Sequence, residues 1–247
     1  MNKSLWFLVS IMMAIPAKAL DAINTKSAIV IDGRANETDW AKAPWYKIDQ
    51  HILGAVPTPD DFSGRFKMLW DDQQIYLLAE ITDDQLFDRH PDPLDSYWDD
   101  DCLEIFVDED KSGGNHQFNF NAFAYHVALD NQIVDIGESN EDGTTNFVLL
   151  NEHVTSQWRR QASSPHHIIW ELSIRIYDKS FSLRSNAKNK PVNLSKNKQL
   201  GFMVAYCDND GSYSRESFMG STAIVPQNGN KNLGYITSDV FDTLILK

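Results

Sequence analysis

Residues 168–176 read IIWELSIRI, and this stretch decides the fold class. Large apolar side chains occupy every second position, and polar residues such as Glu171 and Ser173 fill most of the positions between them. Successive side chains of a β-strand point to opposite faces of the sheet, so this alternation predicts a strand with one face in a hydrophobic core. Trp170 lies on the apolar face and is expected in that core.

The same period of two recurs in 65–70, where Phe66, Met68 and Trp70 form the apolar set. Similar runs predict strands over 28–31, 75–81, 102–107, 116–121, 125–130, 201–208 and 242–246. Turn-forming sequences such as Asp142-Gly143 separate these runs. Many short strands with such turns predict an all-β fold, an antiparallel two-sheet β-sandwich of the jelly-roll or immunoglobulin-like type.

Two segments interrupt the strand pattern. Residues 37–43, after Asn36, predict one or two helical turns, with Trp40 packed over one end of the core. Residues 178–199 carry six basic side chains and one acid, which predicts a solvated loop; the alternative is a patch for an anionic sugar or surface polymer.

Composition restricts the class of protein and its partners. The 247 residues are 42% hydrophobic, enough for a sizeable core, and the net charge is −13. A negative surface repels phosphate backbones and anionic lipid head groups, so nucleic acid and membranes are not expected as partners. A β-sandwich of this length is expected to be one domain, here 20–247, and to act as a monomer.

The first residues predict export. A short basic start precedes an apolar run over 4–16, and Ala17-Lys18-Ala19 has the form that signal peptidases cut. About 13 apolar residues are too few to span a bilayer, which takes roughly 20. We therefore predict a signal peptide over 1–19, cleaved after Ala19, and a secreted or periplasmic protein.

Cys102 and Cys207 are the two cysteines of the sequence. An oxidising compartment would allow them to form a disulfide. The alternative is two unpaired thiols packed in a sheet as small apolar groups. Neither has a second cysteine or a histidine at the close spacing of a zinc site, so zinc is not predicted.

Three signatures in the first half go beyond hydrophobic patterning. They are Ile31-Asp32-Gly33 with Asp39-Trp40 and Ala43, then 69–72 leading through Ile75-Tyr76 to Thr82-Asp83, and then 98–101 followed by 103–108. In this order and spacing, the series resembles the carbohydrate-binding modules of family 9, within the DOMON-like β-sandwiches. The resemblance covers 29–130 and continues more weakly after His166.

The resemblance implies a sugar site. In the family, a terminal sugar lies between two tryptophan rings. Trp98 matches the first ring, and Glu104 matches an acid that accepts hydrogen bonds from sugar hydroxyls. The segment 117–121 matches a third contribution to the pocket, with Asn119 standing where xylanase modules place an arginine. No tryptophan follows Trp170, so Tyr213, Phe218 or Tyr235 is expected to replace the second ring. The expected ligand-binding residues are Trp98, Glu104, Asn119, Asn121, Tyr213 and Phe218.

Local pattern supports two of these residues. Trp98 lies in the polar stretch 95–101, where a core tryptophan would be unusual. Glu104 alternates with Leu103 and Ile105, so it faces away from the core if they face inward. An aromatic ring stacks on the apolar face of a sugar, and a carboxylate pairs with its hydroxyls.

Acidic residues near Trp98 suggest a cation. Family-9 modules hold calcium structurally, and residues 99–101 with Asp83, Asp84 and Asp108 could supply oxygen ligands. Asp99, Asp101 and Asp108 are the expected set. The alternative is a solvated acidic cluster.

The sequence thus predicts an exported, non-catalytic protein that binds a sugar or glycan end in polysaccharide catabolism. One alternative is a glycoside hydrolase, or its accessory subunit, because two carboxylates suffice for hydrolysis. A second is a haem protein of the DOMON-like group, with Met68, Met203 or Met219 as an axial ligand. The seven histidines carry no recognisable catalytic spacing.

Overall fold

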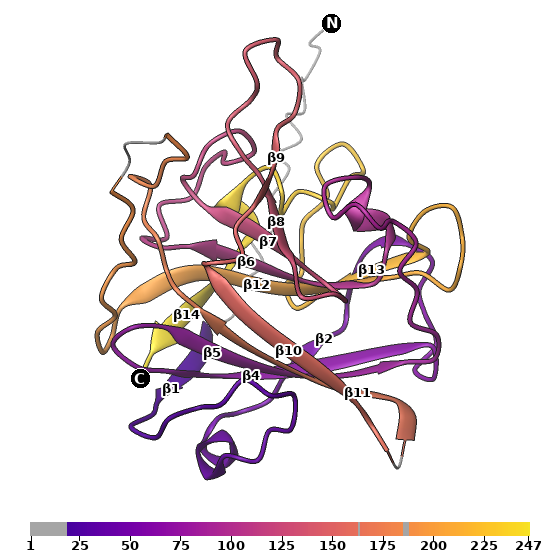
Figure 1. Cartoon of the computed structure of the whole chain (residues 1–247), viewed down its shortest axis with the longest axis horizontal. Helices are drawn as coiled ribbons and strands as arrows, with labels where there is room; N and C mark the ends of the chain where they lie inside the picture. The colour runs from indigo at the N-terminus through magenta and orange to yellow at the C-terminus, as the bar shows by residue number, and fades with distance from the viewer. Residues whose placement is uncertain (1–18, 163, 185–187) are drawn as a thin grey trace, which may run out of the picture.

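The computed structural model describes residues 19–162, 164–184 and 188–247. This part of the chain forms fourteen strands and three short 3₁₀ helices (Figure 1). The strands are β1 (Ala19–Asn24), β2 (Tyr46–Ile48), β3 (Gln50–Gly54), β4 (Phe62–Trp70), β5 (Ile75–Asp83), β6 (Cys102–Asp108), β7 (Phe123–Ala128), β8 (Ile133–Ile136), β9 (Phe147–Leu149), β10 (Val154–Gln161), β11 (Ser164–Ile174), β12 (Gln199–Asp208), β13 (Ser217–Gly220) and β14 (Asp242–Leu246). The helices are η1 (Thr38–Lys42), η2 (Tyr97–Asp99) and η3 (Ser238–Val240). In these residues no helix is long and apolar enough to cross a membrane.

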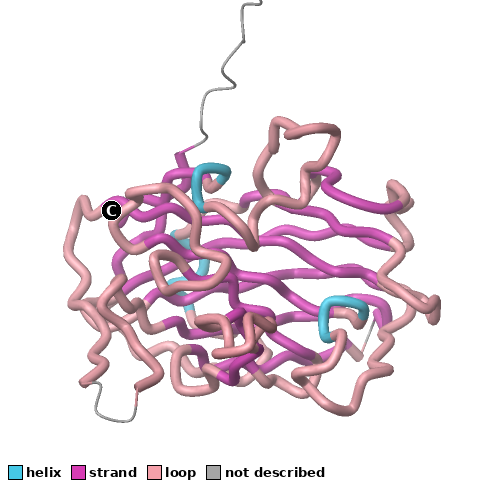
Figure 2. Tube along the Cα trace, turned by 90° about the horizontal axis from the view of Figure 1, so that it is seen from above, coloured by secondary structure: helices cyan, strands magenta, loops and turns pink. Residues whose placement is uncertain are grey.

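The strands form two packed layers, which we call the lower and upper sheets after their places in Figure 1. The lower sheet has the order β10-β11-β5-β4, with β2 also paired to β4. The upper sheet has the order β14-β12-β6-β7-β8-β9, with β13 and β3 added beyond β12. Figure 2 shows the strands side by side across the body, with loops around the rim. The predicted β-sandwich is confirmed.

Strand β1 joins the two sheets. Ala19 is in register with Thr243 of β14, and Ile23 is in register with Leu69 of β4. Both pairings are parallel, so the predicted antiparallel arrangement holds for the other strand pairs but not for β1. The predicted signal peptide 1–19 lies outside the described residues except for Ala19.

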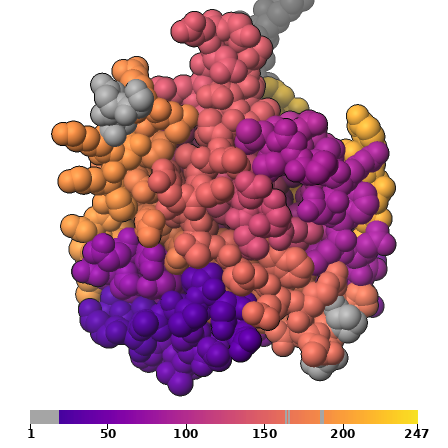
Figure 3. All heavy atoms as spheres, in the orientation of Figure 1, coloured from indigo at the N-terminus to yellow at the C-terminus, as the bar shows by residue number. Residues whose placement is uncertain are grey.

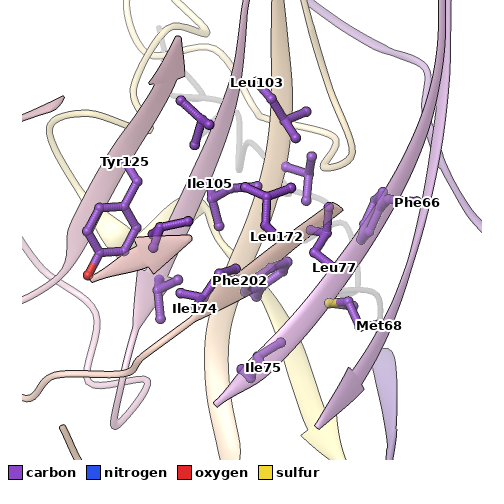
Figure 4. Close-up of a cluster of buried hydrophobic side chains, with 14 of the residues drawn as sticks. Phe66, Met68, Ile75, Leu77, Leu103, Ile105, Tyr125, Leu172, Ile174 and Phe202 are labelled. Atoms are coloured by element: carbon purple, nitrogen blue, oxygen red, sulfur yellow. The ribbon is translucent and has the colours of Figure 1, made fainter. Parts of the chain in front are cut away.

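The core fills the space between the sheets. Apolar side chains of β11, including Leu172 and Ile174, face Leu103 and Ile105 of β6 (Figure 4). Trp170 is fully buried in the same cluster, as the alternation predicts. Each large side chain removed from water stabilises the fold by roughly 1.5–3 kcal/mol, so this inter-sheet cluster dominates the folding energy.

A segment before β2 covers the outer face of the lower sheet. Trp40 on η1 packs there against Leu69, Tyr76 and Ile169. The helical turn is confirmed, but Trp40 lies over a sheet face and not over one end of the core. The adjacent prediction of a strand over 28–31 is wrong, because this apolar run also packs on that face without joining a ladder.

Glu171 fixes this covering segment from β11. One carboxylate oxygen accepts the backbone N–H groups of Asp32, Gly33 and Arg34, and the other accepts the indole N–H of Trp40. Gly33 has φ +73°, and a Cβ there would lie 2.9 Å from the backbone carbon of Trp158. The Ile31-Asp32-Gly33 and Asp39-Trp40 signatures therefore build a structural anchor.

Two other predictions concern loops. The predicted strand 116–121 is wrong, because the chain turns there and the next strand, β7, begins at Phe123. Within the described part of 178–199 no strand forms before Gln199, and the lysines are largely exposed, as a solvated loop requires. Phe181 and Leu194 still tie this loop to the core.

Candidate functional site

A cavity of about 310 Å³ opens on the outer face of the upper sheet. Phe218 of β13 and the loops around Leu233 and Phe241 cover one part of this face and pack on β6 and β12. The cavity occupies the neighbouring part, over β6, β7 and β8. Its volume is at the lower end of the roughly 300–1,000 Å³ of small-ligand sites, which suits one or two sugar rings. The β8–β9 loop beside it projects from the molecular surface (Figure 3).

One wall of the cavity is aromatic. Tyr97 and Trp98 come from η2, and Phe147 comes from β9. The Trp98 and Phe147 ring centroids lie 5.6 Å apart, and the Tyr97 ring meets both edge-on or nearly so. All three rings are half-buried. They therefore form one continuous surface that packing holds in place, and Tyr235 adds a fourth ring to the lining.

The position of η2 is fixed by the residues that follow it. The Asp100 carboxylate accepts the backbone N–H groups of Arg89 and His90, and Asp101 accepts those of Phe87 and Asn209. The loop after β12 is tied to η2 directly, since the N–H of Arg215 donates to the Asp99 carboxylate at 3.2 Å. The Trp98 wall and Arg215 are thus held by one hydrogen-bonded frame.

The floor of the cavity is charged. Glu104 Oε1 lies 3.6 Å from Arg215 Nη1 and 3.8 Å from His126 Nδ1, and it accepts a hydrogen bond from the Cys207 thiol at 3.2 Å. Burial favours a protonated Glu104, but its contact with His126 and the charge of Arg215 outweigh burial and lower its pKa below the ordinary value. Burial also opposes the charge of Arg215, whose pKa is nevertheless raised by Cys207 and Glu104.

Asp135 of β8 is a second carboxylate in the lining. It is buried and accepts the backbone N–H groups of Ala124 and Ile136. Burial, with a smaller contribution from the Glu104 charge, raises the pKa of Asp135 to about 7. The cavity therefore holds one carboxylate that stays ionised and one that titrates near neutral pH.

The structure brings together some of the residues predicted from sequence. Trp98 and Glu104 line the cavity, and Glu104 faces away from Leu103 and Ile105, as the alternation predicts. Tyr235, one of the three replacements considered for the second ring, also lines it.

Four predicted residues do not line this cavity. Asn119 is exposed, and its side-chain oxygen accepts a hydrogen bond from the backbone N–H of Asn121. The side-chain amide of Asn121 donates to the Gly113 carbonyl. Tyr213 is 84% exposed on the loop after β12. Phe218 is buried beneath Arg215, with the guanidinium 4.4 Å from its ring centroid.

Other lining residues have no sequence signal. Arg215, Asp135 and Phe147 come from segments without a local motif, and only the sheet pairing brings them beside Glu104. Gln117 lines the cavity in place of its neighbour Asn119.

The predicted calcium ligands do not converge. Asp101 and Asp108 lie at opposite ends of β6, about 23 Å apart at 3.3 Å per residue. Asp108 instead accepts hydrogen bonds from Gly113 N–H and the Ser238 hydroxyl. Asp99 holds the backbone of Arg215. The three-aspartate ligand set is therefore wrong.

A different set of carboxylates does meet. Oxygens of Asp83, Asp101 and Asp208 lie within 4.8 Å of one another, and all three residues are buried. Burial and mutual repulsion raise their pKa values to about 6, about 9 and about 7 respectively. Oxygen ligands whose charges repel one another fit a hard divalent cation such as calcium.

Cys102 and Cys207 face each other across β6 and β12, in register and fully buried. Both are free thiols in the structure. Of the two alternatives left open by the sequence, the structure describes unpaired thiols at the cavity floor.

These features define a class: a β-sandwich with an aromatic and charged ligand cavity on the outer face of one sheet. The chain belongs to the family described as carbohydrate family 9 binding domain-like, whose model matches residues 31–247. This is a family of carbohydrate-binding modules, as the resemblance implies.

Known relatives agree with this assignment. The chain is 29% identical over 133 residues to the exoglucanase XynX of Acetivibrio thermocellus, covering 54% of this chain but only 11% of that enzyme. Two solved structures of a carbohydrate binding module family 9 from Caldicellulosiruptor kristjanssonii, one with cellotriose and one with glucose, share the fold with a TM-score of 0.65. Each is 18% identical, covers 93% of this chain, and is itself covered to 94% and 96% respectively.

Proposed function

We propose that the Glu104 cavity binds a sugar or the end of a glycan chain, and that the protein serves polysaccharide breakdown without catalysis. One observation carries the proposal: Trp98 and the Glu104–Arg215 ion pair line the same cavity. The aromatic wall offers a surface for the C–H face of a pyranose. The floor offers a carboxylate acceptor and a guanidinium donor for its hydroxyls.

The titration state of the floor suits a neutral ligand. Glu104 is ionised and Arg215 is charged, so the pair is already balanced and demands no net charge from the ligand. Asn232 and Gln117 add uncharged polar groups around it. Glucose and cellotriose, which the C. kristjanssonii module binds, are neutral sugars and are the first ligands to test.

Titration calorimetry with glucose, cellotriose and xylo-oligosaccharides tests the proposal. Sugars exchange strong contacts with water for similar contacts with protein, so we expect dissociation constants on the order of micromolar to millimolar. Glu104→Gln keeps the side-chain shape but removes the charge, and should weaken binding at least about tenfold, or 1.4 kcal/mol. Glu152→Gln, an exposed residue outside the lining, is the matched control. Absence of binding across the panel would contradict the proposal.

Glu104→Gln also tests whether the protein is a catalyst. Glu104 and Asp135 are both in the lining, and their pKa values move in opposite directions, as in an acid and base pair. Asp135, however, has both oxygens engaged by backbone N–H groups. We expect no turnover of aryl glycosides; turnover that disappears in Glu104→Gln would establish a hydrolase instead.

We also propose two supporting properties. The protein is exported, on the strength of the leader-like sequence 1–19. Asp83, Asp101 and Asp208 hold a structural calcium ion, which would offset two of the three charges of these buried carboxylates beneath the Trp98 frame. The calcium proposal replaces the ligand set expected from the sequence.

A further inference from the structure

We propose that the cavity floor is a zinc site formed by Cys102, Cys207, His126 and Glu104, which goes beyond the sugar-binding function. Each residue offers a ligand atom that zinc accepts: two sulfurs, one imidazole nitrogen and one carboxylate oxygen. They come from three adjacent strands of the upper sheet, β7, β6 and β12.

The distances between neighbouring ligand atoms are close to those of tetrahedral coordination. Zinc bonds of about 2.3 Å to sulfur and 2.0–2.2 Å to nitrogen or oxygen place tetrahedral ligand atoms roughly 3.3–3.8 Å apart. Here Cys102 Sγ lies 3.1 Å from His126 Nδ1, Cys207 Sγ lies 3.2 Å from Glu104 Oε1, and His126 Nδ1 lies 3.8 Å from Glu104 Oε1. The two sulfurs and the Glu104 oxygen all lie within 4.8 Å of one another. His126 Nδ1 does not belong to that group, so its ring would have to move toward Cys207 to complete the tetrahedron.

The charges also balance. Two thiolates and one carboxylate carry three negative charges, and Zn²⁺ with the Arg215 guanidinium supplies three positive ones. Arg215 Nη1 is 3.0 Å from Cys207 Sγ, so it would remain as a hydrogen-bond donor to a zinc-bound sulfur. Such partners outside the ligand shell orient the ligands of metal sites.

The site has an entry path. Glu104 and His126 line the cavity, whereas both cysteines are fully buried behind them. An ion that enters the cavity therefore meets the carboxylate and imidazole first and the sulfurs second. Spacing along the sequence could not indicate this site, because Cys102 and Cys207 become neighbours only through the pairing of β6 with β12.

The experiment uses the full folded protein, reduced with a phosphine, stripped with a chelator and dialysed anaerobically against Zn²⁺ alone. We expect one zinc per chain by atomic absorption. Cys102→Ser, Cys207→Ser and His126→Gln should each weaken binding by at least roughly tenfold. His166→Gln, an exposed histidine, should still bind one zinc. No sugar is present, so the outcome is independent of the proposed sugar binding.

Cobalt keeps the test decisive if a cysteine variant fails to fold. Co²⁺ in the wild-type protein should give the near-ultraviolet absorption of sulfur-to-metal charge transfer, and Zn²⁺ should remove it. Reduced, folded protein that binds no zinc would overturn the inference. So would cobalt bound without the sulfur band, or a Cys102–Cys207 disulfide that resists reduction in the folded protein and leaves no zinc binding.

Discussion

The Glu171 carboxylate accepts the indole N–H of Trp40 at 3.2 Å, although the two residues are 131 positions apart. The second oxygen of Glu171 gathers three successive backbone N–H groups of the loop over 32–34. Glu171 is fully buried, and burial of a carboxylate without partners would destabilise the fold. Its four hydrogen bonds offset that cost. This one side chain therefore ties two separate parts of the covering segment to the lower sheet.

The first prediction follows from that contact. Glu171→Gln places an amide N–H₂ among N–H donors and removes the charge, so the cover should loosen. We expect a loss of about 3 kcal/mol in the free energy of unfolding, measured by urea denaturation, with sugar affinity unchanged. Exposed Glu152→Gln is the control. A loss below about 1 kcal/mol would show that Glu171 is not the anchor.

The second prediction concerns Trp98. Its half-buried ring packs on Tyr97 and Phe147 and lies outside the inter-sheet core. Trp98→Ala should abolish measurable sugar binding in calorimetry and cost less than about 1 kcal/mol of stability. A loss of the roughly 3–5 kcal/mol typical of a buried aromatic would instead make Trp98 a core residue.

The third prediction distinguishes the candidates for the second ring. Tyr235 lines the cavity, whereas Tyr213 is exposed and faces Arg89. Tyr235→Ala should weaken sugar binding by roughly five- to tenfold, because an aromatic contact contributes about 1 kcal/mol to binding. Tyr213→Ala should have no effect. The reverse result would move the site toward the loop after β12.

The fourth prediction concerns calcium. If Asp83, Asp101 and Asp208 hold the ion, adding calcium should raise the melting temperature, because a ligand bound only to the native state stabilises it. Asp101→Asn should remove the increase. Asp108→Asn should retain it, since Asp108 lies at the other end of β6. An increase that survives Asp101→Asn would place the ion elsewhere.

The fifth prediction is a dependence on pH. His153 Nδ1 shares a hydrogen bond with the Tyr125 hydroxyl, and its ring stacks on Tyr177. Burial lowers the pKa of His153 to about 3. The unfolded chain takes up this proton below about pH 6.5 while the native chain does not. Stability should therefore fall as the pH falls from about 6.5 to about 3, by up to roughly 1.4 kcal/mol per pH unit.

The contribution of His153 is isolated by a variant. In His153→Leu, urea denaturation between pH 7 and pH 4 should show a smaller loss of stability than in the wild type. Parallel curves for the two proteins would assign the acid sensitivity to other groups.

Much of the fold could be predicted because it follows from alternation. The inward faces of β4, β5, β6, β11, β12 and β14 repeat with a period of two, and tertiary packing uses that pattern directly. The error at 28–31 arose because an apolar run that covers a sheet face has the same composition as a strand. Strand β1 is absent from the sequence prediction because it begins at Ala19, the last residue of the predicted signal peptide.

The site could be predicted only in its local parts. Trp98 and Glu104 lie six positions apart, and a sequence pattern can record such a spacing. Arg215 reaches Glu104 from across two paired strands, and nothing near Arg215 in the sequence indicates that contact. The register of β6 with β12, which creates the floor, is a property of the folded sheet.

The pairing of β1 with β14 has a consequence for how the molecule folds. The first and last strands meet, with Leu20 beside Leu244, so this closure spans nearly the whole chain. Contacts between distant segments slow folding, because loop entropy is lost before they form. The upper sheet reaches its full width only when the last strand, β14, has been synthesised. We therefore expect the sheet to close in a late and cooperative transition. Removal of 242–246 should expose the edges of β1 and β12 at once, and the truncated chain should then pair with its own copies.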